Sequence, residues 1–252
     1  MTFLVFQLQA QLAAWGEAAV GEYRGSADHP SESALLGLIG AALGIHREDD
    51  ASHAALCKGY GFAVGMQSSG KLLRDYHTAQ VPGRVALKGR PHATRSDELA
   101  MPRHELNTVL STRDYRQDGS WLVAVQMFEG APYTLDDLAG AIRHPRFALY
   151  LGRKSCPPAA PLFPQVVNAS SAYQAFIVYR AQLRERRDAC KDRWNRPPLE
   201  ESAPITRIAW SDGVDSGVKA DLSVTRKDRI IRRKGWQFGD RAEHIAMVNE
   251  AS

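Results

Sequence analysis

The sequence lacks the features that mark membrane-spanning, exported and disulfide-rich proteins. Its 252 residues contain no run of about 18 apolar side chains, so we expect no transmembrane helix. The first residues have no basic segment ahead of the apolar one, which is unlike a secretory signal peptide. The three cysteines, Cys57, Cys156 and Cys190, are too widely spaced for a disulfide framework or a zinc site. These absences predict a protein of the reducing cytoplasm.

Motifs of the common enzyme chemistries are also missing. The sequence contains no G-x-S-x-G motif and no His/Cys/Asp/Glu cluster with metal-ligand spacing, so we expect no catalytic serine, no metal and no cofactor. The stretch Gly65–Leu72 comes close to a phosphate-binding P-loop, but Leu72 stands where a Ser or Thr must hold magnesium. The residues after it are typical of a strand, so we interpret Gln67–Gly70 as a hairpin turn.

Positive charge is scarce early in the chain and concentrated downstream. Residues 1–73 hold four Lys/Arg against seven Asp/Glu, whereas residues 143–154 hold four Lys/Arg and no acid. Residues 226–241 hold seven Lys/Arg against two Asp. This distribution is typical of a surface that binds phosphates, although a solvated, solubilising surface also explains it.

The order of the predicted elements indicates an α+β fold. Caps mark two helices: Ser31 and Gly44 bound the first, and Thr134 with Asp137 forms a capping box at the start of the second. Between and around them, aromatic and branched residues predict strands. The predicted strands are 2–9, 60–66, 71–77, 106–115, 121–128 and 147–151, with a turn at 117–120 and a further short helix at 48–58. This order is ferredoxin-like, as in RNA-recognition motifs.

We predict two parts of the chain. Residues 1–165 form the ferredoxin-like domain, in which 78–105 is a long thumb-like insertion without regular periodicity and with five basic residues. Residues 166–252 form a smaller, basic, β-rich region. We expect it to contain a helix or arm at 171–195, strands at 205–210 and 219–225, and a basic segment at 226–241 that includes Trp236.

The strongest binding candidate follows the predicted strand 147–151. Gly152 allows a close backbone approach, Arg153 can fork to a phosphate, Lys154 adds a point charge and Ser155 donates a hydrogen bond. The alternative is an ordinary basic turn.

Two strands offer further candidates. Arg113 and Tyr115 share one face of a strand, so Arg113 can hold a phosphate while Tyr115 stacks on a base or packs in the core. Gln7 and Gln9 likewise share a face and either bond base edges or lie at the sheet surface. Arg24 is expected to contact RNA or a neighbouring subunit.

Histidines near the insertion suggest an alternative function. His77, His92 and His104 lie within or beside it, with Tyr76 and Lys88 nearby. Such a group can cleave RNA, because a base removes the 2′-hydroxyl proton and an acid protonates the leaving oxygen. Isolated surface histidines are the other interpretation.

Several separated motifs resemble one family in the expected order. They are Leu4–Ala10, Ala14–Gly16, Ser33–Gly37, Leu73–His77, Arg113–Tyr115 and Tyr150–Cys156. Up to about Val167 the chain resembles the CasD family of small subunits of the type I-E CRISPR Cascade complex, within the repeat-associated (RAMP) superfamily. Beyond that point the resemblance is diffuse.

The resemblance implies a non-catalytic RNA-binding subunit. Such a subunit caps the repeat-derived 5′ handle of the crRNA and contacts the Cascade backbone subunits and the large subunit, with target DNA near the complex and no membrane. It also implies that Arg74 and His77 of the Leu73–His77 motif contact RNA. A metal-independent endonuclease and a generic RNA-binding module remain as alternatives.

Overall fold

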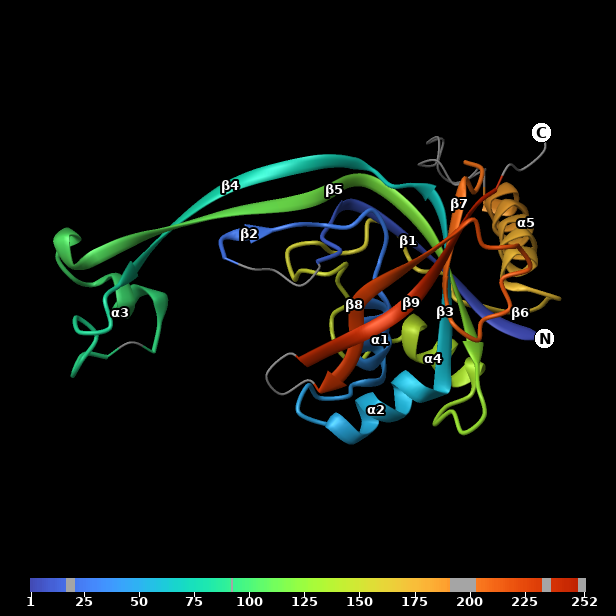
Figure 1. Cartoon of the computed structure of the whole chain (residues 1–252), viewed down its shortest axis with the longest axis horizontal. Helices are drawn as coiled ribbons and strands as arrows, with labels where there is room; N and C mark the ends of the chain where they lie inside the picture. Colours follow the sequence, from blue (N-terminus) through green and yellow to red (C-terminus); the bar gives the residue numbers. More distant parts are fainter. Residues whose placement is uncertain (17–20, 92, 191–202, 233–236, 249–252) are drawn as a thin grey trace.

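The computed structural model describes residues 1–16, 21–91, 93–190, 203–232 and 237–248 (Figure 1). Its helices are α1 (Glu32–Leu43), α2 (Asp50–Gly59), α3 (Arg95–Leu99), α4 (Leu135–Arg143) and α5 (Ala172–Cys190), with a 3-10 turn at Arg103–Glu105. Its strands are β1 (Thr2–Ala13), β2 (Tyr23–Arg24), β3 (Tyr60–Ser68), β4 (Lys71–Pro82), β5 (Leu106–Met127), β6 (Gln165–Asn168), β7 (Arg207–Ser211), β8 (Leu222–Arg232) and β9 (Gln237–Met247). The described part of the chain therefore combines five α-helices with a nine-stranded sheet.

Four central strands have the ferredoxin-like arrangement. Their spatial order is β6-β1-β5-β3, and each neighbouring pair is antiparallel. In chain order, α1 lies between β1 and β3, and α4 lies between β5 and β6. The α+β fold and its ferredoxin-like element order, expected from the sequence, are confirmed.

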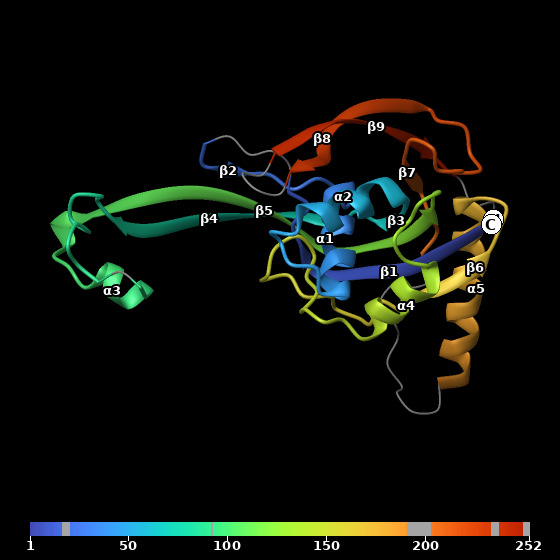
Figure 2. The same cartoon turned by 90° about the horizontal axis from the view of Figure 1, so that it is seen from below.

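A single strand, β5, runs through both the body and a long projecting arm (Figures 1 and 2). Residues 116–126 of this 22-residue strand pair with β1, whereas residues 106–117 pair with all of β4. The resulting two-stranded hairpin stands away from the body and carries α3 at its tip. The predicted insertion 78–105 covers the end of β4 and the tip, and the paired strands extend beyond it on both sides.

Two predicted turns are wrong. β3 and β4 do not pair with each other, because each pairs with a successive stretch of β5. Residues 67–70 therefore form a kink, at which Gly70 has φ 69° and an added Cβ would lie 2.5 Å from the Gln117 carbonyl oxygen. Residues 117–120 form an irregularity inside β5, where Asp118 has φ 56°.

The predicted helix ends are confirmed. The Ser31 hydroxyl accepts a hydrogen bond from the Ala34 amide, and Gly44 closes α1 at φ 78°. Thr134 and Asp137 form the expected capping box of α4. These caps satisfy backbone groups that a helix leaves unpaired at its ends.

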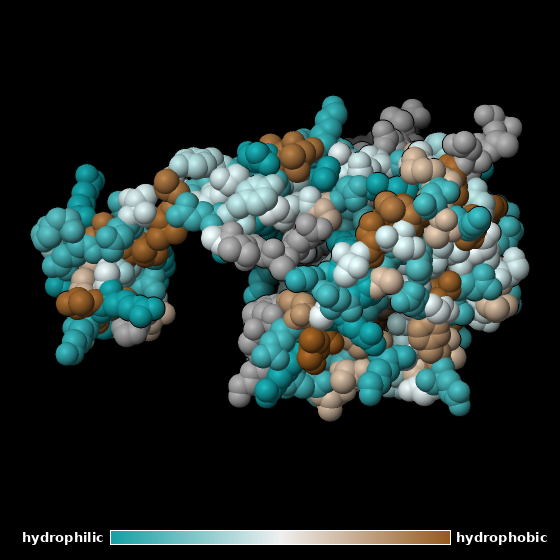
Figure 3. All heavy atoms as spheres, viewed as in Figure 1, coloured by the Kyte–Doolittle hydropathy of each residue, from teal (hydrophilic) through white to brown (hydrophobic). Residues whose placement is uncertain are grey.

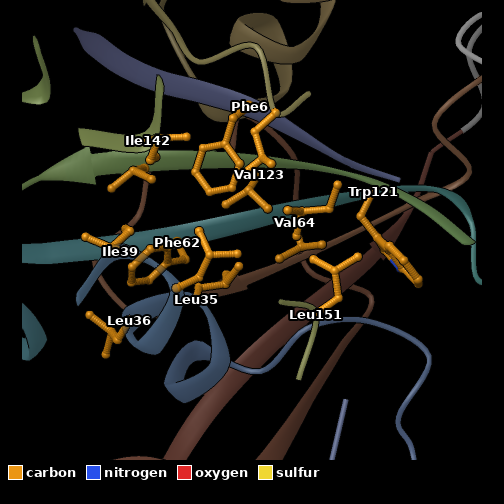
Figure 4. Packing of buried hydrophobic residues seen from close by; sticks show 14 of the residues in the cluster. Phe6, Leu35, Leu36, Ile39, Phe62, Val64, Trp121, Val123, Ile142 and Leu151 are labelled. Atoms are coloured by element: carbon orange, nitrogen blue, oxygen red, sulfur yellow. The ribbon is translucent and has the colours of Figure 1, made fainter. Parts of the chain in front are cut away.

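Within the body the sheet is buried on both faces, which explains the mostly apolar sequence of β1, whereas β4 in the arm is largely exposed. Leu4, Phe6 and Leu8 point into a core with α1 and α4, part of which Figure 4 shows. Phe3 and Val5 point the other way, into a second core under α5. Two helical layers therefore enclose the sheet from opposite faces.

The predicted strand 147–151 is wrong. This stretch is an irregular connection in which Leu151 is buried but Phe147 and Tyr150 are about 40% exposed. The fourth strand of the ferredoxin-like unit is β6.

The C-terminal strands extend the same sheet. β7 pairs with β3, and the β8–β9 hairpin continues from β7 to the sheet edge. Helix α5 follows the prediction up to Cys190; residues 191–195 of that prediction, and Trp236, lie outside the described residues. The division at residue 165 remains a prediction, and strands on both sides of it belong to one hydrogen-bonded sheet.

A buried network of charges fastens this C-terminal hairpin over the start of α1. Asp228 of β8 accepts a hydrogen bond from the Glu32 amide at 2.9 Å and pairs with Arg241 at 2.8 Å. Glu243 of β9 contacts the His29 ring at 3.0 Å. Because these groups are almost fully covered, each charge depends on its partners for stabilisation.

The network sets the charge states of His29 and Glu243. Burial opposes the protonation of His29, but its contacts with Asp28 and Glu243 raise its pKa above the ordinary value of 6.5, even though Arg226 lies 2.8 Å from the same ring. Burial also opposes the ionisation of Glu243, but His29, Arg226 and Arg241 lower its pKa from 4.5 to about 2.

This network predicts a defined pH dependence of stability. Because its pKa is raised, His29 adds to the free energy of unfolding in full below pH 6.5, and this stabilisation is lost as the pH rises above that value. Because its pKa is lowered, Glu243 adds to the free energy of unfolding in full above pH 4.5, and this stabilisation is lost as the pH falls toward 2. We therefore expect maximal stability between about pH 4.5 and pH 6.5, the ordinary pKa values of the two groups.

The loss of stability at alkaline pH is measured by thermal unfolding of the wild-type protein and of His29→Gln between pH 5 and pH 9. Each 1 kcal/mol of lost stabilisation lowers the melting temperature by roughly 2–4 °C in a chain of this size. The wild-type melting temperature should fall more steeply with pH than that of the variant. Parallel curves for the two proteins would contradict the role assigned to His29.

Candidate RNA-binding surface

The base of the arm brings together most of the predicted binding residues. β2 pairs with β5 there, with Arg24 opposite Arg113. Paired residues share a face of a sheet, so Arg24 and Arg113 lie on one face together with Tyr115. We call this set, with Arg153 and Lys154, the arm-base surface.

Arg153 lies directly over Tyr115. The centre of its guanidinium is 4.7 Å from the ring centroid, a cation–π geometry. Its Nη2 and Nη1 donate to the carbonyl oxygens of Arg24 at 3.4 Å and of Asp114 at 3.5 Å. These contacts hold the guanidinium plane over the junction of β2 and β5.

Gly152 makes this placement possible. Its φ is 85°, and an added Cβ would lie 1.8 Å from the Ala14 carbonyl oxygen at the end of β1. Only glycine fits so close to that backbone. Lys154 and Ser155 follow on the exposed side of the same turn.

A polar clamp on the opposite face of the arm joins three strands. The buried carboxylate of Asp114 accepts two hydrogen bonds from Arg74, at 2.9 and 3.1 Å, and one from the Tyr23 hydroxyl at 2.5 Å. The hydrogen bond from Arg74 is the largest of the effects that lower the pKa of Asp114. The bond to Asp114 in turn raises the pKa of Tyr23. Arg74 is thus committed to a structural contact, although its side chain is 57% exposed.

The arm-base surface carries positive charge without acidic partners. Among the residues that the structure describes, no carboxylate lies within 4.0 Å of the charged atoms of Arg24, Arg113 or Lys154. Asp75 lies opposite Arg113 in the register, but the ion-pair contact it makes is with His77, at 3.9 Å. Unpaired arginine and lysine side chains on an open surface attract phosphate groups.

The structure corrects the interpretation of Gln7 and Gln9. Both are buried, and the Gln7 side chain donates to the Pro161 carbonyl oxygen at 2.8 Å. The segment 159–162 also hydrogen-bonds to the backbone of both residues, so it covers this face of β1. RNA cannot reach the two glutamines in this conformation.

Other predicted residues fall at the margin of the surface. His77 is 46% exposed and lies farther along the arm, opposite Ser111. Arg153 covers one face of the Tyr115 ring, so a base cannot stack on that face. Sequence reasoning missed Tyr23 and Asp114, whose partners lie 91 and 40 residues away in the sequence.

Two negative findings concern the described residues as a whole. No group of three or more His, Cys, Asp and Glu among them is placed to hold a metal ion. None of the helices formed by them is both long enough and apolar enough to cross a bilayer.

The chain belongs to the family described as CRISPR-associated protein (Cas_Cas5). The profile of this family matches residues 3–242. A curated relative, CRISPR system Cascade subunit CasD of Escherichia coli (strain K12), is 33% identical over 186 residues, which are 71% of this chain and 77% of the relative. The resemblance found in the sequence motifs is therefore confirmed.

Solved structures share the fold. One, described as a CRISPR RNA-guided surveillance complex, matches with a TM-score of 0.59 and 21% identity over 98% of this chain and 90% of the other. Another, described as the crystal structure of a Cas protein, matches with a TM-score of 0.56 and 18% identity over 98% and 95%. The overall fold of this chain is thus shared with these two structures.

Gly152 offers a test of how the surface is built. We expect Gly152→Ala to lower the free energy of unfolding by more than the roughly 1–3 kcal/mol that backbone strain alone costs, because the new methyl group also meets the Ala14 carbonyl. Gly130→Ala is the matched control, since Gly130 has φ 78° but open space around its Cβ position. Chemical denaturation of both variants measures the difference. Equal losses would contradict the close approach of Gly152 to β1.

Proposed function

We propose that this protein is a non-catalytic RNA-binding subunit of a CRISPR Cascade complex, and that its arm-base surface holds the repeat-derived 5′ handle of the crRNA. The observation that carries the proposal is the guanidinium of Arg153, fixed over Tyr115 and flanked by Arg113 and Lys154, which have no acidic partner among the described residues. This arrangement combines a flat stacking surface with phosphate-binding charges.

The chemistry of the surface suits a single strand of RNA. Phosphates bound by Arg113, Lys154 and Arg24 would fix the register of the handle. A base would stack on the outward face of the Arg153 guanidinium, since the inward face lies against Tyr115. Target sequence would then be read by guide–target pairing and not by this chain.

Membership of the complex is supported by the relative named as a Cascade subunit. In that setting we propose contacts with the backbone subunits and the large subunit, near the target DNA, in the cytoplasm. The arm suits such contacts, because it exposes Leu72, Leu73 and Val109, and Figure 3 shows hydrophobic atoms among hydrophilic ones along it. Exposed apolar side chains on a projecting ribbon are typical of a protein interface.

The arrangement of the described part of the arm disfavours the alternative function of an endonuclease through His77 and His104, while His92 lies outside the described residues. His77 is five residues from the end of β4, whereas His104 lies in the 3-10 turn before β5. At about 3.3 Å per strand residue, the two are separated along the arm by roughly 16 Å or more, too far for one acid–base pair. Tyr76 and His77, being adjacent in a strand, point to opposite faces.

The proposal predicts selective loss of guide RNA on removal of the unpaired charges. The protein is co-expressed with the other Cascade subunits and a CRISPR array and purified through a tag, and the bound RNA is sequenced. We expect guides with one common 5′ end, and at least about tenfold less of them with Arg113→Ala and Lys154→Ala combined, because each lost phosphate contact costs binding energy.

The matched control is Arg184→Ala on exposed α5, under the opposite sheet face, which should leave the RNA unchanged. Heterogeneous RNA, or equal recovery from all variants, would refute the proposed handle site. Metal-independent cleavage of repeat RNA that disappears in His77→Ala would instead favour the endonuclease.

A further inference from the structure

A basic notch between the ends of two helices is not used by the proposed RNA site. It is lined by residues from the C-terminal parts of α1 and α4, which pack against each other. Its volume is about 360 Å³. It is lined by Ala42, Leu43, Gly140 and Ala141 together with Tyr133, His144 and Arg146, and we call the last three residues its rim.

The rim is held in place by the backbone. The Tyr60 hydroxyl donates to the Tyr133 carbonyl oxygen at 2.6 Å and accepts from the Tyr133 amide at 3.0 Å. The Arg146 amide donates to the Ala42 carbonyl oxygen at 3.0 Å, and the aliphatic part of Arg146 packs against Gly44. The notch is therefore a preformed feature and not a gap between loose side chains.

The charge of the notch is of one sign. Its lining contains Arg146 and His144 but no carboxylate, and residues 140–156 as a whole contain no Asp or Glu. No ion pair of Arg146 occurs among the described residues. Beside the notch, Phe147 and Tyr150 are about 40% exposed, so the surface is both aromatic and basic.

We propose that this notch binds an acidic segment of a neighbouring protein subunit, with an apolar side chain inserted between the helices and a carboxylate on Arg146. A protein fits better than RNA, because the lining holds one guanidinium, that of Arg146, among mostly apolar or small residues. RNA is held through several phosphates and therefore needs several Lys/Arg side chains. The volume is large enough for one large side chain and part of the residues next to it in the bound segment.

The inference rests on the proposed assembly into a Cascade complex, and it is tested in that complex. Tyr133 is replaced by the photoreactive residue p-benzoylphenylalanine, the complex is co-expressed with its subunits and guide RNA, and irradiated cross-links are mapped by mass spectrometry. We expect a cross-link to a protein segment with more Asp/Glu than Lys/Arg.

Two pairs of variants sharpen the test. Gly140→Phe places a large side chain in the notch, at a position where an added Cβ meets no atom within 4 Å, and should reduce the cross-link at least tenfold. Ala181→Phe on exposed α5 is its control and should change nothing. Arg146→Gln should reduce the cross-link, whereas Arg146→Lys, which keeps the charge, should preserve most of it.

The outcomes separate this inference from the proposed function. A cross-link to RNA, to a basic segment, or to nothing within an assembled complex would overturn the inference alone. A cross-link that Gly140→Phe leaves unchanged would do the same. Failure of the complex to assemble would overturn both.

Discussion

The hydrogen bonding of β5 on both edges is the constraint on which the rest of the structure depends. Within the body, β5 lies between β1 and β3 and carries the middle of both cores. Beyond the body, the same strand pairs with β4 on one edge and with β2 on the other. The arm-base surface lies where the body part of β5 passes into the arm part. The position of Arg113 and Tyr115 relative to the core is thus fixed by one continuous strand, whereas Arg153 and Lys154 come from a turn that lies against the end of β1 at Gly152.

Polar contacts then fix the parts that apolar packing does not reach. Asp114 ties Arg74 and Tyr23 across three strands at the arm base, and Arg153 closes the other face over Tyr115. In the body, the charges around Glu243 fasten the C-terminal hairpin over α1. In both places the carboxylate is buried and surrounded by cations, so loss of either partner leaves a costly unpaired charge.

The sequence predicted what depends on local chemistry. Both helix caps were correct because Ser31, Gly44, Thr134 and Asp137 act within one turn of chain. The turn at 67–70 was wrong because a glycine at positive φ marks a kink as well as a hairpin, and only pairing with distant β5 decides which. Gln7 and Gln9 looked available because alternation reveals a face but not what covers it, here residues 159–162. The predicted residues Arg24, Arg113, Tyr115, Arg153 and Lys154 come together at the arm base, and their role in binding stays a prediction. The clamp of Tyr23 and Asp114 had no local signal.

The pairing of β1 with β5 also sets the order in which the chain can be built on the ribosome. Phe3 pairs with Gln126, so the apolar first strand emerges long before its partner exists. The last strand, β9, supplies Glu243 to His29, so the charge network closes only after nearly the whole chain is released. Such distant pairing slows folding and leaves apolar strands exposed for longer, which favours aggregation. Early association with neighbouring subunits or with chaperones would therefore determine the yield of native protein in the cell.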